Sequence, residues 1–176
     1  MKIYVKDANL ILDLFNGRVL DAWFALGYET ITTSLVLREV SDEGQKMQLN
    51  TYVSKGLLKI EDVVATDWVK ISELSVKWSV SIPDASVAML ALKTSSCLLT
   101  GDGRLRKKAE EIGIDVRGIL WVLDHLIEEQ KITSAAACKA LKSIAGKGAF
   151  LPHGEVEIRR QNFRGQLVKV PLSFSL

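Results

Sequence analysis

Short apolar runs alternate with longer amphipathic segments over the first two thirds of the chain. The runs are rich in β-branched and aromatic residues, which is typical of buried strands. Between them, apolar side chains recur every three or four residues, as on one face of a helix. The predicted strands are residues 3–5, 30–33, 57–60, 97–100 and 114–116. Strands that alternate with helices predict an α/β protein with a central parallel sheet covered on both faces.

The pattern becomes purely helical after residue 118. Apolar spacing there predicts helices at residues 119–129, 134–144 and 155–164. We therefore expect a main domain over residues 1–146, with a C-terminal helix and tail over 147–176 that dock on it. The last ten residues are apolar and contain a proline, and three interpretations stay open: a docked tail, an extension that pairs with a partner, or an expression remnant.

Composition narrows the class of protein. A chain of 176 residues, of which 48% are apolar, is large enough for one well-packed domain. No run of about 18 apolar residues predicts a membrane span, and charges at Lys2 and Lys6 come too early for a signal peptide. We expect Cys97 and Cys138 to be buried, reduced thiols. Together these features predict a cytoplasmic protein without a membrane anchor.

Four acidic residues lie where predicted elements begin or end: Asp7, Glu39, Asp84 and Asp102. Asp7 and Asp102 directly follow predicted strands, so parallel topology places both at the same edge of the sheet. Asp84 lies in the first turn of a helix that runs over residues 82–92. Any one aspartate alone is better explained as a helix cap. Glu39 has no such role, although a solvated surface glutamate remains an alternative.

Carboxylates gathered in one pocket raise one another's pKa and need a cation. A set of oxygen ligands suits Mg²⁺ or Mn²⁺, whereas Zn²⁺ prefers histidine and cysteine. Neither His125 nor His153 has a partner at metal-binding spacing. Such metal ions activate water and orient phosphodiesters, so the acids predict a metal-dependent hydrolase.

The order of these motifs along the chain resembles the PIN domain family. It is carried by Asp7-Ala8-Asn9 after the first strand, Glu39, Pro83-Asp84-Ala85 and Leu99-Thr100-Gly101-Asp102. The resemblance covers about residues 1–123. PIN domains are Mg²⁺- or Mn²⁺-dependent ribonucleases that include the VapC-type toxins of toxin–antitoxin modules. The resemblance implies a three-layer α/β/α fold, an endoribonuclease acting on RNA, a homodimer and an antitoxin protein as partner.

The resemblance also implies roles for individual residues. Asp7, Glu39, Asp84 and Asp102 are expected to be catalytic, and the three aspartates among them to hold the metal ion. Asn9 and Thr100 occupy supporting polar positions. Many family members carry a further acid two residues after the last aspartate, but Arg104 stands there. A second tightly bound metal ion is therefore in doubt.

A basic cluster follows the last acid, although the net charge of the chain is only +2. Arg104, Arg106 and Lys107, with the neighbouring Lys108, are expected to contact RNA phosphates. The alternative is an ordinary solvated helix face. The four tryptophans, at 23, 68, 78 and 121, fall at core spacing on predicted helices and are expected to pack in the interior.

Two other functions stay open. A PIN fold kept only as a binding module would retain the acids without activity. A haloacid-dehalogenase-like phosphatase also has an aspartate after its first strand, but it needs a second acid two residues later, where Asn9 stands. Because an amide cannot transfer the proton, this alternative is the weaker one.

Overall fold

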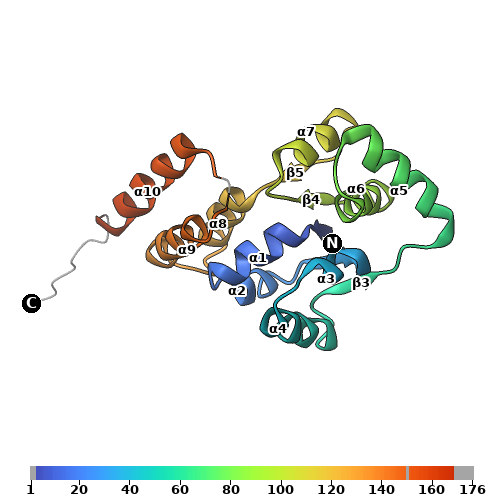
Figure 1. Cartoon of the computed structure of the whole chain (residues 1–176). Coiled ribbons are helices and arrows are strands. Elements are labelled where there is room, and N and C mark those ends of the chain that lie inside the picture. Colours follow the sequence, from blue (N-terminus) through green and yellow to red (C-terminus); the bar gives the residue numbers. More distant parts are fainter. Residues whose placement is uncertain (1–2, 150, 169–176) are drawn as a thin grey trace, which may run out of the picture.

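A five-stranded, wholly parallel sheet forms the centre of the molecule (Figure 1). The computed structural model describes residues 3–149 and 151–168. In chain order the strands are β1 (Ile3–Lys6), β2 (Glu29–Thr33), β3 (Lys59–Glu61), β4 (Cys97–Leu99) and β5 (Val116–Arg117). Their order across the sheet is β3-β2-β1-β4-β5. All five predicted strands and the parallel sheet are confirmed.

The helices fill the connections between strands and continue beyond the sheet. They are α1 (Ala8–Asn16), α2 (Leu20–Phe24), α3 (Ser34–Glu39), α4 (Glu43–Ser54), α5 (Ala65–Trp78), α6 (Ile82–Thr94), α7 (Gly103–Glu111), α8 (Ile119–Glu128), α9 (Ser134–Gly146) and α10 (His153–Val168). Helix α6 packs on β1, β2 and β4 and contacts α5 and α7, whereas α1, α8 and α9 pack together as a second group (Figure 1). The predicted α/β/α fold is confirmed.

The connections explain why the helices fall into two groups. The chain passes from β1 outward to β2 and β3, then returns across the sheet to β4 through α5 and α6. Since parallel crossovers are right-handed, this reversal places α1 and α6 on opposite faces of the sheet. The reversal point lies between β1 and β4, and ligands bind at such points outside the carboxyl ends of the strands.

The C-terminal helices share the core of the sheet domain. Ile144 of α9 and Phe163 of α10 are buried in the same apolar cluster as Leu98 of β4. Helix α10 packs on α9, and Arg159 Nε donates to Asp124 Oδ2 of α8 at 2.8 Å. The division of the chain at residue 146 stays a prediction. The segment 169–176, which covers most of the apolar tail, lies outside the described residues.

Some expectations about burial are wrong. Trp23 and Trp78 are core residues, but Trp68 is 41% exposed on the outer side of α5 and Trp121 is only half-buried. Helical spacing shows which residues share a face, but not how much of that face a neighbour covers. Cys97 and Cys138 are likewise half-buried thiols. Among residues 3–149 and 151–168, no helix has both the length and the apolarity to cross a bilayer.

Candidate functional site

Asp7 is the buried centre of the site. It follows β1, caps α1 and is only 1% exposed, with Oδ1 accepting a hydrogen bond from the Leu10 N–H at 2.7 Å. Its Oδ2 accepts from the Thr100 hydroxyl. Burial raises the pKa of Asp7 to about 7 against the effect of these hydrogen bonds, and the charges of Asp84 and Asp13 raise it further. A carboxylate in this position is stabilised by a nearby cation.

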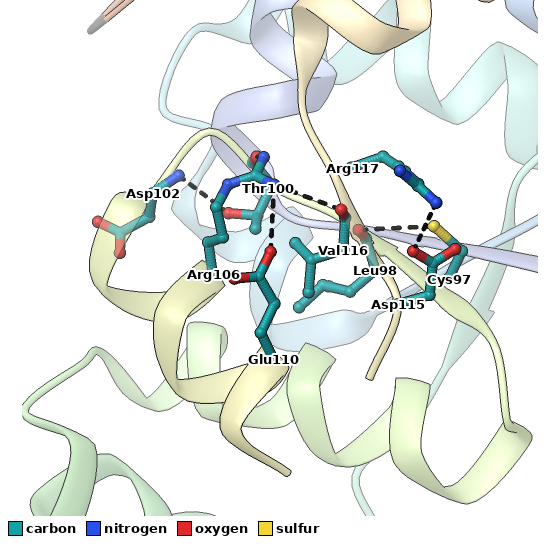
Figure 2. Close-up of polar contacts among 9 residues, drawn as sticks. All are labelled: Cys97, Leu98, Thr100, Asp102, Arg106, Glu110, Asp115, Val116 and Arg117. Atoms are coloured by element: carbon teal, nitrogen blue, oxygen red, sulfur yellow. Dashed lines mark hydrogen bonds and ion pairs between the residues drawn. The ribbon is translucent and has the colours of Figure 1, made fainter. Parts of the chain in front are cut away.

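Thr100 connects Asp7 to the turn after β4. Besides donating to Asp7, its hydroxyl accepts from the Asp102 N–H at 3.0 Å (Figure 2). Asp102 in turn caps α7, because its Oδ1 accepts from the Leu105 N–H at 2.6 Å. One fully buried hydroxyl therefore fixes the carboxyl ends of β1 and β4 relative to each other. Sequence analysis predicted a supporting role for Thr100, and that role stays a prediction.

Asp84 reaches the same region from α6. The Ser81 hydroxyl accepts from the Asp84 N–H at 3.1 Å, and Asp84 Oδ2 accepts from the Ser81 N–H at 3.3 Å, which is a complete capping box. Ser86 ties this first turn to β2: its hydroxyl donates to the Pro83 carbonyl at 2.6 Å and lies 2.8 Å from the Thr33 hydroxyl. Sequence analysis missed Thr33 and Ser86, since a buried hydroxyl pair between distant elements leaves no local pattern.

Glu39 lies at the exposed end of α3. Partial burial and the charge of Asp84 raise its pKa. Asp84 thus acts electrostatically on both Asp7 and Glu39, and Thr100 links Asp7 to Asp102. The four predicted acids are thus linked pairwise, and their assembly into one site stays a prediction.

The side chains present fit a hard divalent cation held through few protein ligands. In the part of the chain that the structure describes, no three histidine, cysteine or acidic side chains form a ready-made metal-binding group. Each Asp7 oxygen accepts one hydrogen bond and keeps another lone pair. Mg²⁺ commonly binds through one or two carboxylates and retains water. Ligation of the ion by Asp7, Asp84 and Asp102 stays a prediction.

Asp13 is an acid that sequence analysis missed. It lies one helical turn after the exposed Asn9 on α1, and the two line a cavity of about 350 Å³ together with Asp102. Burial raises the pKa of Asp13 to about 6. A four-residue spacing from Asn9 in an otherwise apolar helix was the available signal.

Two of the predicted RNA-binding cations are held by the protein itself. Arg104 Nη1 donates to the Ser79 carbonyl at 2.9 Å. Arg106 donates to the carbonyls of Thr100 and Val116, both at 3.3 Å, and so joins the ends of β4 and β5 (Figure 2). Lys107 lies exposed on α7, and its contact with an RNA phosphate stays a prediction.

Arg106 also explains a glycine. A Cβ atom at Gly118 would lie 2.7 Å from Arg106 Nη2, closer than side-chain atoms approach. The glycine therefore allows the guanidinium group to lie against the strand ends. Glu110 holds the same group from the next helical turn, with 3.6 Å between Arg106 Nη1 and Glu110 Oε1 (Figure 2). These contacts give Arg106 a structural role beneath the Thr100 turn.

Lys6 is a second buried ionisable residue beside Asp7. It is 1% exposed, and its ammonium nitrogen is the buried side-chain atom without a hydrogen-bond partner among the described residues. That nitrogen lies 4.1 Å from the Trp23 ring centroid. A ring face favours the cation, but complete burial outweighs this and lowers the pKa of Lys6 well below its usual range.

Comparisons with known proteins agree with the fold. The family model DUF3368, described as a PIN domain, matches residues 3–163. The crystal structure of PAE2754 from Pyrobaculum aerophilum is similar in fold, with a TM-score of 0.53 and 18% sequence identity over 72% of this chain and 98% of that one. A search of curated proteins gave no match.

Proposed function

We propose that this chain, which belongs to the PIN domain family, is a Mg²⁺- or Mn²⁺-dependent endoribonuclease and the toxin of a toxin–antitoxin module. The observation that carries the proposal is the Asp7 carboxylate, which is tied through Thr100 to the Asp102 turn and whose pKa is raised by burial and further by the charge of Asp84. Family membership supports a nuclease-type activity. RNA as substrate, the choice of metal and the toxin role are the finer parts of the proposal.

The residues divide the work of hydrolysis among them. A bound Mg²⁺ or Mn²⁺ ion supplies an activated water and stabilises the departing oxygen. Asp7, Asp84 and Asp102 would hold the ion, and Thr100 keeps the Asp7 carboxylate in one orientation by donating to Oδ2. Glu39 adds a further acid, whose pKa the charge of Asp84 helps to raise. Lys107 contacts a backbone phosphate of the RNA.

The alternatives make different demands on the same residues. A binding module without activity needs no cation, whereas Asp7 at pH 8 would be an ionised, fully buried group, a state that costs stability. A phosphatase of the haloacid-dehalogenase type needs an acid where the exposed Asn9 lies. Calorimetric titration with Mn²⁺ separates the nuclease from the silent module. With Arg104 in place of the further acid, we expect weak binding at one site.

Asp84→Asn tests the nuclease assignment, with Asp42→Asn as its matched control. Asp42 also supports a helix start through its carboxylate, but as the N-cap residue of α4: its Oδ1 accepts from the Gln45 N–H at 2.8 Å, and it is exposed and outside the site. Both variants should keep their stability within about 1 kcal/mol, since asparagine also caps helices. We expect Asp84→Asn to lose metal-dependent cleavage of single-stranded RNA by more than about 100-fold, and Asp42→Asn to match the wild type.

Thermal melting gives this experiment a second readout. Without metal, Asp84→Asn should melt at or above the wild-type temperature, because one negative charge near Asp7 is removed. With Mn²⁺ the order should reverse, because the wild type gains binding free energy. Cleavage by Asp84→Asn at the wild-type rate contradicts the assignment. The homodimer is tested by light scattering at tens of micromolar, where a monomer would remove that part of the proposal.

A further inference from the structure

Two cavities lie side by side along the turn after β4. The first, the acid cavity, is the space of about 350 Å³ that Asn9, Asp13 and Asp102 line. The second, of about 400 Å³, is lined by Thr100, Gly103 and Trp121 and is named the apolar cavity below. Gly101, Ile119 and Leu151 line both. The shared lining makes them two compartments of one groove at the carboxyl edge of β4.

The two compartments differ in chemistry. The acid cavity presents the amides, carboxylates and ammonium group of Asn9, Asn16, Asp13, Asp102 and Lys147. The apolar cavity is lined mainly by the side chains of Ile119, Leu120, Trp121, Leu151 and Pro152 and by the backbone of three glycines. One ligand that spans both compartments must therefore have a polar, charged part and a flatter apolar part.

The arginines of the apolar cavity are already engaged. Arg106 donates to the Thr100 and Val116 carbonyls. Arg159 is paired with Asp124, and Glu155 lies within 2.5 Å of its Nη1. A second phosphate group would have to break these bonds, whereas an uncharged ring can pack beside the guanidinium groups without breaking them. The compartment suits a planar, neutral group with hydrogen-bonding edges.

We propose that the apolar cavity holds one base of a single-stranded RNA whose sugar-phosphate backbone lies in the acid cavity. This deepens the proposed function and rests on it for the identity of the strand. Proteins that recognise single-stranded RNA read unstacked bases in such apolar and aromatic sites. A volume of about 400 Å³ is also in the range of small-ligand pockets. A base in duplex RNA is stacked and cannot enter.

Gly103 offers a way to fill the apolar cavity without disturbing the fold. It is the first residue of α7 and lines this cavity but not the acid cavity. A Cβ atom built there meets no atom within 4 Å. Gly146, the last residue of α9, is equally open but lines neither cavity. Gly103→Leu is therefore the test variant and Gly146→Leu its matched control, both with a better helix former than glycine.

The probes are a fluorescein-labelled pentaribonucleotide and five copies of it, each lacking the base at one position. Binding is measured by fluorescence anisotropy with Ca²⁺ in place of Mg²⁺, and intact RNA is confirmed on a gel. We expect wild-type protein to bind one of the abasic strands at least about tenfold more weakly than the intact strand, the range of a single stacked base. Gly103→Leu should bind the intact strand as weakly as that abasic strand, and Gly146→Leu should match the wild type.

The outcomes separate this inference from the proposed function. If all abasic strands bind wild-type protein as well as the intact strand does, or if no strand binds, the base site is overturned. If an apolar protein segment occupies the apolar cavity instead of a base, the abasic strands and the intact strand should bind equally well. The base site is also overturned if Gly103→Leu weakens the binding of every strand equally, because the substitution would then affect contacts with the RNA backbone and not with a base. If the protein distinguishes the abasic strands but does not cleave RNA with metal present, only the proposed nuclease activity is rejected.

Discussion

Two strand-to-helix turns carry the predicted site residues Asp7 and Asp102, and they follow the same local design. Asp7 follows β1 and caps α1, and Asp102 follows the Thr100 turn of β4 and caps α7. In both, Oδ1 accepts from the N–H three residues later, at 2.7 Å for Asp7 and 2.6 Å for Asp102. The difference is burial, because Asp7 is 1% exposed whereas Asp102 is half-buried. Local geometry alone therefore cannot distinguish a cap from a functional acid.

Burial, and not the capping hydrogen bond, distinguishes Asp7 from the other capping aspartates. Asp42 makes the same bond at the start of α4, at 2.8 Å, and is exposed. At Asp102 the cap alone accounts for the side chain's hydrogen bond. At Asp7 the cap does not explain why an acid is buried there. Burial raises the pKa of Asp7 to about 7, so the ionised carboxylate lowers the stability of the folded protein. A buried acid that lowers the stability of the folded protein is expected where it binds a ligand such as a cation.

Exchanging each acid for asparagine should give the largest effect. We expect both Asp7→Asn and Asp102→Asn to lose RNA cleavage by more than about 100-fold. Without metal at pH 8, Asp7→Asn should gain about 1 to 3 kcal/mol in free energy of unfolding, while Asp102→Asn should stay within about 0.5 kcal/mol, since asparagine caps equally well. Urea denaturation and a gel assay measure both. Full activity in Asp102→Asn would reduce the second turn to a cap.

The pH dependence of the Asp7 effect has a definite sign. A carboxyl group with a raised pKa favours the protonated folded protein, so its contribution is fully present below about pH 4 and is lost as the pH rises toward about 7. Asparagine does not titrate. The stability advantage of metal-free Asp7→Asn should therefore grow between about pH 4 and 7 and then level off. An advantage that shrinks over this range would contradict the assigned pKa.

Removing the link between the two turns should give a smaller effect. Thr100→Val keeps the shape of the side chain but loses the bond to Asp7 and the acceptor for the Asp102 N–H. We expect cleavage to fall by about 10- to 100-fold and stability by about 1 to 3 kcal/mol. Thr100→Ser should restore most of the activity, because it restores the hydroxyl. If valine and serine behave alike, the hydroxyl link has no role.

Lys6→Met should have the smallest effect on cleavage. The ammonium group lies beside Trp23 without a hydrogen-bond partner among the described residues, so methionine removes a buried polar group and fills similar space. We expect a stability gain of about 1 to 3 kcal/mol near pH 7, with cleavage within about twofold of wild type. A loss of stability would show that the amine is needed where it lies.

The stability effects of Lys6→Met and Asp7→Asn should depend on pH in opposite directions. Lys6 has a lowered pKa in the folded protein, so the unfolded chain binds the extra proton and wild-type stability falls as the pH drops below about 10.5. The advantage of Lys6→Met should therefore grow toward lower pH in the alkaline range. The stability advantage of Asp7→Asn over the wild type should grow toward higher pH in the acid range. Denaturation of both variants across pH 4–10 tests the pair.

The sequence alone determined the sheet and the edge at which the acids meet. Strand runs such as residues 97–100 were recognisable because a buried parallel strand needs a short, continuous apolar run. Asp7 and Asp102 could be placed together from their positions after strands, since crossover handedness is nearly invariant. The prediction of Thr100 as a supporting residue came from the family resemblance, and its bond to Asp7 agrees with it.

Only the tertiary structure decided how each side chain is used. Arg106 and Lys107 are neighbours on a basic helix, yet the first is bound to strand carbonyls and the second is exposed. Asp13 was missed and Trp68 was wrongly expected to be buried for the same reason: helical spacing defines a face, and the packing of distant elements decides whether that face is buried. The groove shared by the two cavities likewise depends on Leu151 lying near Gly101, 50 positions earlier in the chain, and no local pattern encodes a contact across that separation.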